Sequence, residues 1–467
     1  MKTQVFLAST AFGLATLAAA IDDGQFGPDT TRVLVLSNNA NVPEATPAIN
    51  QIAGWDTLRT RFDTVVDLNA AVAPVHPSAW VPRTHELPTW ERYFRAVWGL
   101  GDSEIHLVVE SIQVSPAMAV CRAFADASID VYADGLMSYG PTRNRLPDDV
   151  AWRIERLLHL DLVPGLDPIL LTEWRVPPVV ISSAAFRTVI AQLSPDHVRP
   201  AAPVVLVLGQ YFAAANLLTV EEELELYQQM ILGAAARHQH RVMFKPHPSA
   251  PLSQRLALLT FAAEAGVDLE VATGQELAES WFATGSIALV VGCFSTALAT
   301  AATLYDIPAA RLGTGLLLDR LTPFHNSNRV PATIVDAVVP DLSHPDAPPP
   351  VARPALPHLV AAVGYTMQPI RYPGRRAEAV EFLTAHPDLH ARYFKRRRLT
   401  RLDLPGRLPP REEPVISRAE QTWSELRRTG LRVGRSGLRR LRKARTTLVE
   451  RRRPELEAED PDDKLPS

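Results

Sequence analysis

The sequence predicts an α/β protein built from two Rossmann-like domains that face each other across a cleft, followed by a basic C-terminal tail. Short, continuous apolar runs rich in β-branched residues recur between residues 4 and 291. Such runs are typical of strands that are buried on both faces of a parallel sheet. The stretches between the runs are long enough for crossover helices, and the runs form two successive series. Ligands are expected at the carboxyl ends of such strands.

The composition fits this class. The chain has 467 residues, of which 46% are hydrophobic and 21% charged, which excludes a collagen-like or wholly disordered protein. Its two cysteines, Cys121 and Cys293, lie far apart and in no metal-ligand spacing. We therefore predict two small buried side chains in a reducing compartment, with neither a disulfide nor a zinc site.

The first twenty residues fit two interpretations. Lys2, the apolar stretch Val5–Leu17 and the alanines after it have the three parts of a secretory signal. The same residues also fit a strand over Gln4–Ser9, a small-residue turn and a helix over Leu14–Ile21. We prefer the second interpretation because another strand follows at βαβ spacing.

The predicted strands of each series can be given in chain order. The first series places strands at Gln4–Ser9, Arg32–Ser37, Asp63–Leu68, Ile105–Val109 and Ile129–Tyr132, in an N-terminal Rossmann-like domain of residues 1–198. The second places strands at Val204–Leu208, Arg241–Phe244, Val267–Val271 and Ile287–Val291, with helices over Val220–Arg237, Glu276–Phe282 and up to Thr300, in a C-terminal Rossmann-like domain of residues 199–338.

Three further segments follow the two domains. Residues 339–358 are rich in proline and predict an extended linker. Residues 359–391 contain helical stretches at Leu359–Met367 and Ala377–Leu383 that are expected to pack back on the body. Residues 392–467 are predicted to be a partly disordered tail, in which residues 392–453 carry 21 basic and 6 acidic side chains. The body before the tail is acidic, with 26 basic and 39 acidic side chains over residues 1–391.

The first candidate motif, Ala133-Asp134-Gly135, closes the fifth predicted strand. A carboxylate at a strand end beside a glycine turn can lie over the cleft and remove a proton from a hydroxyl group. The alternative is an ordinary Asp-Gly turn.

The second motif, Lys245-Pro-His247-Pro248, directly follows the predicted strand Arg241–Phe244. Two prolines restrict the backbone around His247, so its imidazole could donate to a phosphate oxygen that gains negative charge as it leaves. A histidine in a proline-rich loop without a ligand is the alternative.

The third motif, Ser295-Thr296, stands where a predicted strand turns into a helix. Hydroxyl groups, backbone N–H groups and the positive end of the helix dipole would meet there, which suits a phosphate. Helix capping alone is the alternative. The chain contains no Walker A loop, G-x-G-x-x-G, G-x-S-x-G or H-E-x-x-H motif, and its one Asp-x-Asp lies in the tail, so we expect metal-independent chemistry.

Together these motifs resemble those of the bacterial sialyltransferases of the GT-B type, and most closely the bacterial polysialyltransferase family. The hallmarks of that family are an acidic-acidic-Gly motif, a His-Pro motif and a later Ser/Thr pair. They correspond here to Ala133-Asp134-Gly135, His247-Pro248 and Ser295-Thr296, and the resemblance spans about residues 1–340. It implies the GT-B fold and inverting transfer of sialic acid from CMP-sialic acid, a donor substrate, to a glycan or glycolipid acceptor, with no cofactor. Residues 1–198 would then form the acceptor domain and residues 199–338 the nucleotide-sugar domain.

The resemblance also implies roles for individual residues. Asp134 would deprotonate the acceptor, His247 would contact and protonate the CMP phosphate, and Ser295 and Thr296 would bind that phosphate; Gly135, Lys245 and Pro248 would complete the binding site. The chain departs from the family at Ala133, where a second acid is usual. This departure leaves open which position carries the base.

Three other functions remain open. A CDP-glycerol type polymer transferase would explain the Lys-Pro-His-Pro and Ser-Thr motifs, and an inactive GT-B-like binding module would explain Ala133. Nucleic-acid binding by the tail is disfavoured because few aromatic residues lie among its arginines. We instead expect residues 392–453 to lie on an anionic membrane surface, which implies a cytoplasmic protein at the inner face of the membrane.

Overall fold

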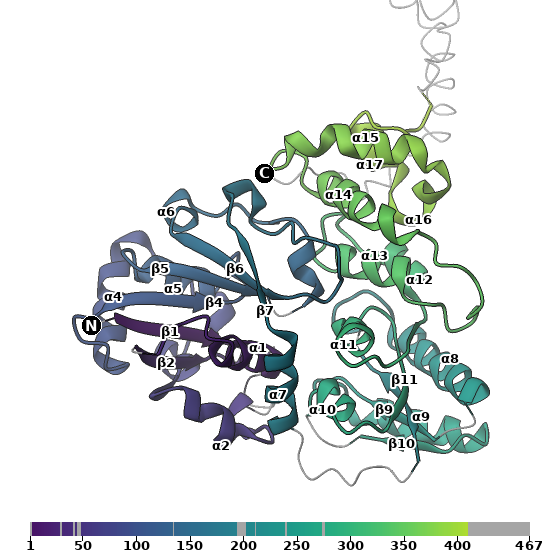
Figure 1. Cartoon of the computed structure of the whole chain (residues 1–467), viewed down its shortest axis with the longest axis horizontal. Helices are drawn as coiled ribbons and strands as arrows, with labels where there is room; N and C mark the ends of the chain where they lie inside the picture. The colour runs from purple at the N-terminus through teal and green to yellow at the C-terminus, as the bar shows by residue number, and fades with distance from the viewer. Residues whose placement is uncertain are drawn as a thin grey trace, which may run out of the picture. The chain divides into compact units, whose positions relative to one another are not determined.

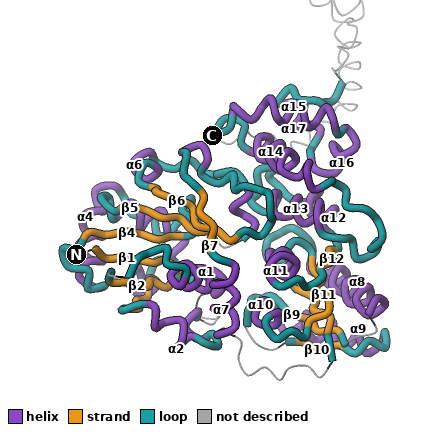
Figure 2. Tube along the Cα trace, in the orientation of Figure 1, coloured by secondary structure: helices purple, strands orange, loops and turns teal. Residues whose placement is uncertain are grey.

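The computed structural model describes residues 2–28, 30–40, 43, 48–133, 135–193, 202–210, 212–238, 241–272 and 276–409. Within this part of the chain the strands form two parallel sheets with helices packed around them (Figures 1 and 2). Both sheets belong to one compact unit, which comprises residues 1–321 and 325–382, and the rest of the chain forms a second unit. The predicted α/β fold with two Rossmann-like domains is confirmed.

The N-terminal sheet has seven strands in the order β3-β2-β1-β4-β5-β6-β7, all parallel. Its central strands are mostly apolar because both faces are covered, and Leu107, Val108 and Val109 of β4 are fully buried. The strands are β1 (Lys2–Ala8), β2 (Thr31–Leu36), β3 (Thr64–Asp67), β4 (Glu104–Val109), β5 (Ser128–Ala133), β6 (Ile154–Leu160) and β7 (Pro178–Ile181). The helices are α1 (Ala11–Asp22), α2 (Trp55–Leu58), α3 (Leu68–Val72), α4 (Leu87–Val97), α5 (Ala117–Ala123), α6 (Asp148–Ala151) and α7 (Ser183–Leu193).

The first residues of the chain form the strand, turn and helix that we preferred. Strand β1 pairs with β2 on one side and with β4 on the other, so it lies in the middle of the sheet. Thr10 caps α1, because its side chain accepts a hydrogen bond from the Gly13 N–H at 2.9 Å. This turn therefore brings Ser9 and Thr10 to the carboxyl edge of the sheet.

The C-terminal sheet has five parallel strands in the order β10-β9-β8-β11-β12. All residues of β8 are buried, as its unbroken Val-Val-Leu-Val-Leu sequence predicts. The strands are β8 (Val204–Leu208), β9 (Val242–Lys245), β10 (Leu269–Val271), β11 (Ile287–Gly292) and β12 (Ala309–Arg311). The helices are α8 (Val220–His238), α9 (Leu252–Glu264), α10 (Ala278–Phe282), α11 (Thr296–Leu304), α12 (Thr314–Arg320) and α13 (Arg329–Val338).

The proline-rich segment after α13 contributes to the C-terminal sheet before it becomes irregular. Asp341 forms a parallel bridge with Arg311 of β12, and an ion pair joins Arg311 Nη1 to Asp341 Oδ2 at 3.0 Å. Helix α14 (Leu356–Met367) begins within the segment, with a proline in its first turn where no hydrogen bond is lost.

The residues after α14 contact the N-terminal domain. The Tyr372 hydroxyl donates to Glu173 Oε2 at 2.7 Å and accepts from the Thr142 N–H at 3.0 Å. Helix α15 (Arg376–Ala385) follows. These bonds hold the segment beside the loops that leave β5 and β6.

The second unit includes residues 322–324 and the chain from Leu383 onward. Its described helices are α16 (His390–Tyr393) and α17 (Arg396–Arg401), with Tyr393 and Leu399 fully buried. The guanidinium of Arg398 lies 5.9 Å from the ring centroid of Phe324. The start of the predicted basic tail is thus folded, whereas residues 410–467 lie outside the described residues.

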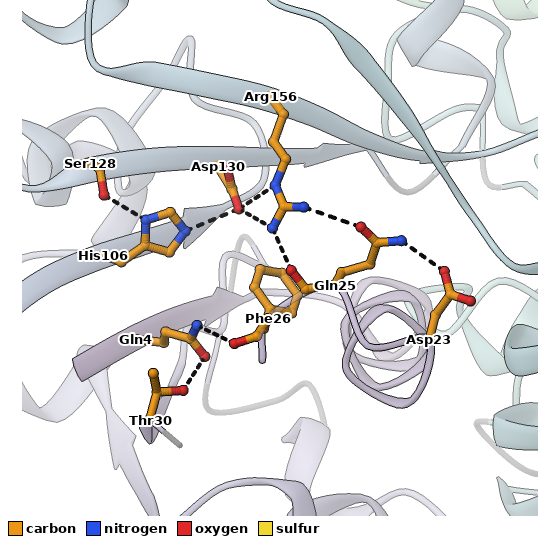
Figure 3. A network of polar contacts seen from close by, with 9 residues as sticks. All are labelled: Gln4, Asp23, Gln25, Phe26, Thr30, His106, Ser128, Asp130 and Arg156. Carbon is orange, nitrogen blue, oxygen red and sulfur yellow. Dashed lines mark hydrogen bonds and ion pairs between the residues drawn. The ribbon is translucent and has the colours of Figure 1, made fainter. Parts of the chain in front are cut away.

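A network of polar side chains crosses the middle of the N-terminal sheet (Figure 3). Asp130 of β5 bonds His106 Nε2 of β4 at 3.0 Å and Arg156 Nε of β6 at 2.9 Å, and His106 Nδ1 lies 2.6 Å from Ser128 Oγ. Arg156 also donates to Gln25. Burial alone would raise the pKa of Asp130, but the hydrogen bonds from His106 and Arg156 bring that pKa below its usual value.

Ser128, His106 and Asp130 are hydrogen-bonded in the same sequence as the residues of a nucleophilic triad. Their position indicates instead that they connect neighbouring strands. Asp130 is fully buried and shared with Arg156, and none of these residues lines the cavities described below. Both cysteines are buried and form no disulfide, as predicted. Burial raises the pKa of the Cys121 thiol to about 12, so this thiol is unreactive.

Candidate active site

A cavity of about 730 Å³ lies between the carboxyl edges of the two sheets. Its walls come from the turns after β1, β2 and β5 on one side and from those after β8, β9 and β11 on the other, together with the start of α10. Six of the predicted site residues line it: Gly135, Lys245, His247, Pro248, Ser295 and Thr296. Three sequence motifs that lie far apart in the chain thus meet in one place, where α/β folds bind ligands.

His247 lies in the loop after β9, with its side chain on the accessible wall of the cavity. Its Nδ1 accepts a hydrogen bond from the Ser249 N–H at 3.1 Å, so the neutral ring carries its proton on Nε2. The surrounding protein and the positive charge of Lys245 lower the pKa of His247. At neutral pH the ring is therefore a neutral hydrogen-bond donor in the absence of ligand.

Lys245 is the last residue of β9 and its half-buried side chain lines the cavity. In the described part of the chain the Lys245 ammonium group forms no hydrogen bond or ion pair. Burial lowers its pKa, while the charges of Glu279 and Glu276 oppose that effect. An anionic ligand beside this ammonium group would stabilise its charged form.

Glu276 and Glu279 lie at the start of α10, on the same cavity wall. The side chain of Glu279 is buried and accepts a hydrogen bond from Thr300 Oγ1 at 2.8 Å, yet burial still raises its pKa. The buried Oε2 atom of Glu276 has no hydrogen-bond partner among the described residues. Sequence reasoning placed a helix here but missed both carboxylates as site residues.

Ser295 and Thr296 stand at the start of α11. Ser295 caps the helix, because its Oγ accepts from the Ala297 N–H at 3.3 Å. The Thr296 hydroxyl accepts from the Leu136 N–H of the N-terminal domain at 3.4 Å. A Cβ atom at Gly135 would lie only 2.6 Å from Thr296 Oγ1, so a glycine is needed where the two edges meet.

The carboxyl edge of the N-terminal sheet carries a group that the sequence did not indicate. Glu110 directly follows β4, is 5% exposed, and accepts hydrogen bonds from both the backbone N–H and the hydroxyl of Ser9. Ser9 and Thr10 line the cavity. A buried carboxylate therefore orients the β1–α1 turn at the N-terminal side of the cavity.

The predicted base, Asp134, lies outside the described residues. Its two neighbours line different spaces: Gly135 lines the main cavity, and Ala133 lines a second, smaller cavity. Among the described residues no group of three or more histidine, cysteine, aspartate or glutamate side chains could hold a metal ion. In the same part of the chain, no helix has the length and apolar character needed to cross a membrane.

The site suits a ligand that carries a phosphate group. A lysine, a histidine donor and a helix N-terminus line one cavity between two Rossmann-like domains, and turns of the N-terminal sheet line its opposite side. This is the arrangement of a glycosyltransferase of the GT-B type, which binds a nucleotide sugar and a glycan acceptor. The chain belongs to the alpha-2,8-polysialyltransferase family, whose model matches residues 4–314.

Other comparisons add less. A search of curated proteins finds no significant match. Among solved structures, UDP-GlcNAc 2-epimerase from Methanocaldococcus jannaschii is 11% identical with a TM-score of 0.41, over 67% of this chain and 84% of that one. MurG of Acinetobacter baumannii is 10% identical with a TM-score of 0.39, over 81% and 94%. E. coli heptosyltransferase WaaC is 15% identical with a TM-score of 0.29, over 67% and 88%.

Proposed function

We propose that the protein transfers sialic acid from CMP-sialic acid to a glycan or glycolipid acceptor, with inversion at the anomeric carbon and without a metal ion or cofactor. The observation that carries this proposal is that Lys245, His247 and the N-terminus of α11 line a single cavity. Together they offer a positive charge, an N–H donor and a helix dipole to the phosphate of the nucleotide.

A single displacement accounts for the reaction. Asp134 takes the proton of the acceptor hydroxyl, whose oxygen then attacks the anomeric carbon. The bond from that carbon to the phosphate oxygen breaks, and the electron pair leaves with CMP. Lys245 and the start of α11 stabilise the charge that develops on the phosphate, and His247 donates to it from Nε2.

His247 stabilises the leaving group in this scheme as a neutral hydrogen-bond donor. Its pKa is lowered in the ligand-free protein, and the hydrogen bond from the Ser249 N–H to Nδ1 leaves the single ring proton on Nε2. A hydrogen bond from Nε2 to a phosphate oxygen offsets the negative charge that develops there. The ring keeps its proton, and CMP leaves as an anion.

A nucleotide panel tests the proposal. A ligand present at 100 times its dissociation constant should stabilise the protein by about 2.7 kcal/mol. We expect thermal stabilisation by CMP and CMP-sialic acid and none by UDP or GDP, followed by CMP release when acceptor is added. Stabilisation by CDP-glycerol but not by CMP-sialic acid would favour the polymer transferase, and no shift with any nucleotide would favour the inactive binding module.

We also propose that the protein works in the cytoplasm, peripherally at the inner face of the membrane. The net charge of +15 over residues 392–453 supports this location, because each basic residue near an anionic surface contributes about 1 kcal/mol. Full-length protein should cosediment with phosphatidylserine vesicles and be released by salt. Equal binding to neutral vesicles would contradict the proposal.

A further inference from the structure

A second cavity, of about 240 Å³, lies beside the carboxyl ends of β4 and β5. Ala133 lines it, and Met137 lines both this cavity and the main one, so the two spaces adjoin the segment that contains Asp134. The volume is below the range of about 300–1,000 Å³ that is usual for drug-sized ligands. It therefore suits a single sugar residue.

Arg143 is the charged residue among the described residues that line this cavity. Its side chain is half-buried, and its Nε is buried without a hydrogen-bond partner in the described part of the chain. The lining contains no aspartate or glutamate in that part of the chain. Burial lowers the pKa of Arg143, as expected when no carboxylate of the protein compensates the charge.

The backbone of Arg143 is fixed from both sides. Its N–H donates to Gln113 Oε1 at 2.5 Å, and its carbonyl accepts from Gln368 Nε2 at 2.9 Å. Gln113 follows β4 and Gln368 follows α14, so two separate parts of the fold hold one arginine at the cavity. The backbone from which the Arg143 side chain reaches the cavity is therefore fixed before a ligand binds.

Strain in the backbone also occurs at this cavity. Ser111, which lines it, has a φ of 47°, a left-handed conformation that is unfavourable for residues other than glycine. Such conformations persist where the surrounding structure enforces them, and they are concentrated at functional sites. Here the strained residue directly follows Glu110 and carries a hydroxyl group at the cavity wall.

We propose that the 240 Å³ cavity is the acceptor subsite and that Arg143 binds the carboxylate of the acceptor's terminal sugar. This inference rests on the proposed function. Guanidinium and carboxylate groups pair through two parallel hydrogen bonds, which orient the sugar as well as hold it. A carboxylate fixed there would present a hydroxyl of the same sugar to the neighbouring Asp134 segment.

A binding experiment on the full-length protein tests the subsite without requiring turnover. The probes are a short oligosaccharide that ends in sialic acid and the same compound with its terminal carboxylate reduced to an alcohol. Hydrogen bonds to charged groups contribute enough that wild type should bind the carboxylate probe about ten- to a hundredfold more tightly. Arg143→Gln should remove this preference, and Arg143→Lys should restore part of it.

Arg145→Gln is the matched control. Arg145 lies two residues away and is exposed, with an ion pair to Asp148 at 3.7 Å, so its substitution should leave the preference unchanged. CMP binding and the melting temperature verify that each variant keeps its fold. The comparison of the two probes on wild type needs no variant, so equal binding would overturn the subsite even if Arg143→Gln does not fold. Arg143→Lys would then test the residue, with a reduced preference as the expected result.

Two results would overturn the subsite: equal binding of both probes by wild type, or an unchanged preference in folded Arg143→Gln. Tighter binding of a glycerol-phosphate probe than of the sialic acid probe would also overturn the carboxylate assignment, in favour of a phosphate-bearing acceptor. Failure of the proposed function is seen separately, as a lack of CMP release from CMP-sialic acid by wild type with every acceptor.

Discussion

The chain contains the tripeptide His-Pro-Ser twice, at residues 76–78 and 247–249, and the two copies share their local geometry. In each, the serine N–H donates to histidine Nδ1, at 3.3 Å for His76 and 3.1 Å for His247. They differ in their surroundings: His76 Nε2 bonds the Ala40 carbonyl at 2.9 Å, whereas His247 lines the cavity beside Lys245. The local sequence determines the tautomer, and the position after β9 makes one copy a candidate catalytic group.

The largest expected effect separates the two copies. His247→Ala should lower kcat/KM for sialic acid transfer about 100- to 10,000-fold, because the donor to the leaving phosphate is lost. His76→Ala should change kcat/KM little. Asp134→Asn should act as strongly as His247→Ala. Steady-state kinetics with CMP-sialic acid test all three variants, and near wild-type rates for His247→Ala and Asp134→Asn would refute the assignment of the site.

The polar network around Asp130 should contribute to stability rather than to catalysis, unlike the side chains that line the main cavity. Asp130→Ala removes the carboxylate shared by His106 and Arg156, and breaking a buried pair in this way costs about 3–5 kcal/mol. The free energy of unfolding from urea titration measures this loss. Asp102→Ala, at an exposed position, is the control. A loss below about 1 kcal/mol in Asp130→Ala would show that the network does not hold the sheet together.

The meeting point of the two sheet edges should give a smaller effect. Gly135→Ala places a Cβ atom 2.6 Å from Thr296 Oγ1, and relieving such an overlap typically costs about 1–3 kcal/mol. The double variant with Thr296→Ser, which removes the Thr296 methyl group but keeps the hydroxyl, should recover little. The double variant with Thr296→Ala should recover most of the stability. Thermal unfolding of the two double variants, compared with Gly135→Ala alone, tests which atom causes the clash.

Helix capping provides a smaller test. Ser295→Ala removes the cap of α11 and should cost about 1 kcal/mol of stability. It should also weaken CMP binding if this helix end contacts the phosphate. Isothermal titration with CMP separates the two effects, since a cap that serves the fold alone would leave the affinity for CMP unchanged once the variant is folded.

The smallest effect concerns pH. The pKa of His247 is lower in the folded protein than its usual value of about 6.5, so the unfolded chain takes up a proton there first as the pH falls. His247 therefore reduces stability at acidic pH and has little effect above its usual pKa. His247→Gln should be more stable relative to wild type at pH 5 than at pH 8, as denaturant titrations at the two pH values would show. An equal difference at both pH values would mean that His247 has the same pKa in both states.

The sequence indicated residues that line the main cavity where a motif follows a strand, and it missed others. Lys245, His247 and Ser295 come directly after apolar runs, so the parallel topology fixes their place. Glu110 also follows such a run, but it becomes notable only through its bonds to Ser9 across the sheet. Arg143 and Glu279 reach their cavities from a loop and a helix start, and no local pattern marks them.

The strands that the sequence analysis missed have physical explanations. Polar side chains interrupt the apolar pattern of β6, including Arg156, which belongs to the buried network. Strand β7 begins with Pro178 at the edge of the sheet, where a missing N–H is tolerated. Strand β12 has only three residues. Each of these strands is stabilised by pairing with a neighbour more than by its own sequence.

The contact between Gly135 and Thr296 also has an evolutionary consequence. Two positions more than 150 residues apart in the chain share one small volume, so a mutation at either changes which residues the other tolerates. Alanine or serine at position 135 becomes acceptable only after position 296 has lost its hydroxyl group. Across descendants of this sequence, the two positions should therefore change together, and the order of the two substitutions should be the same in independent lineages.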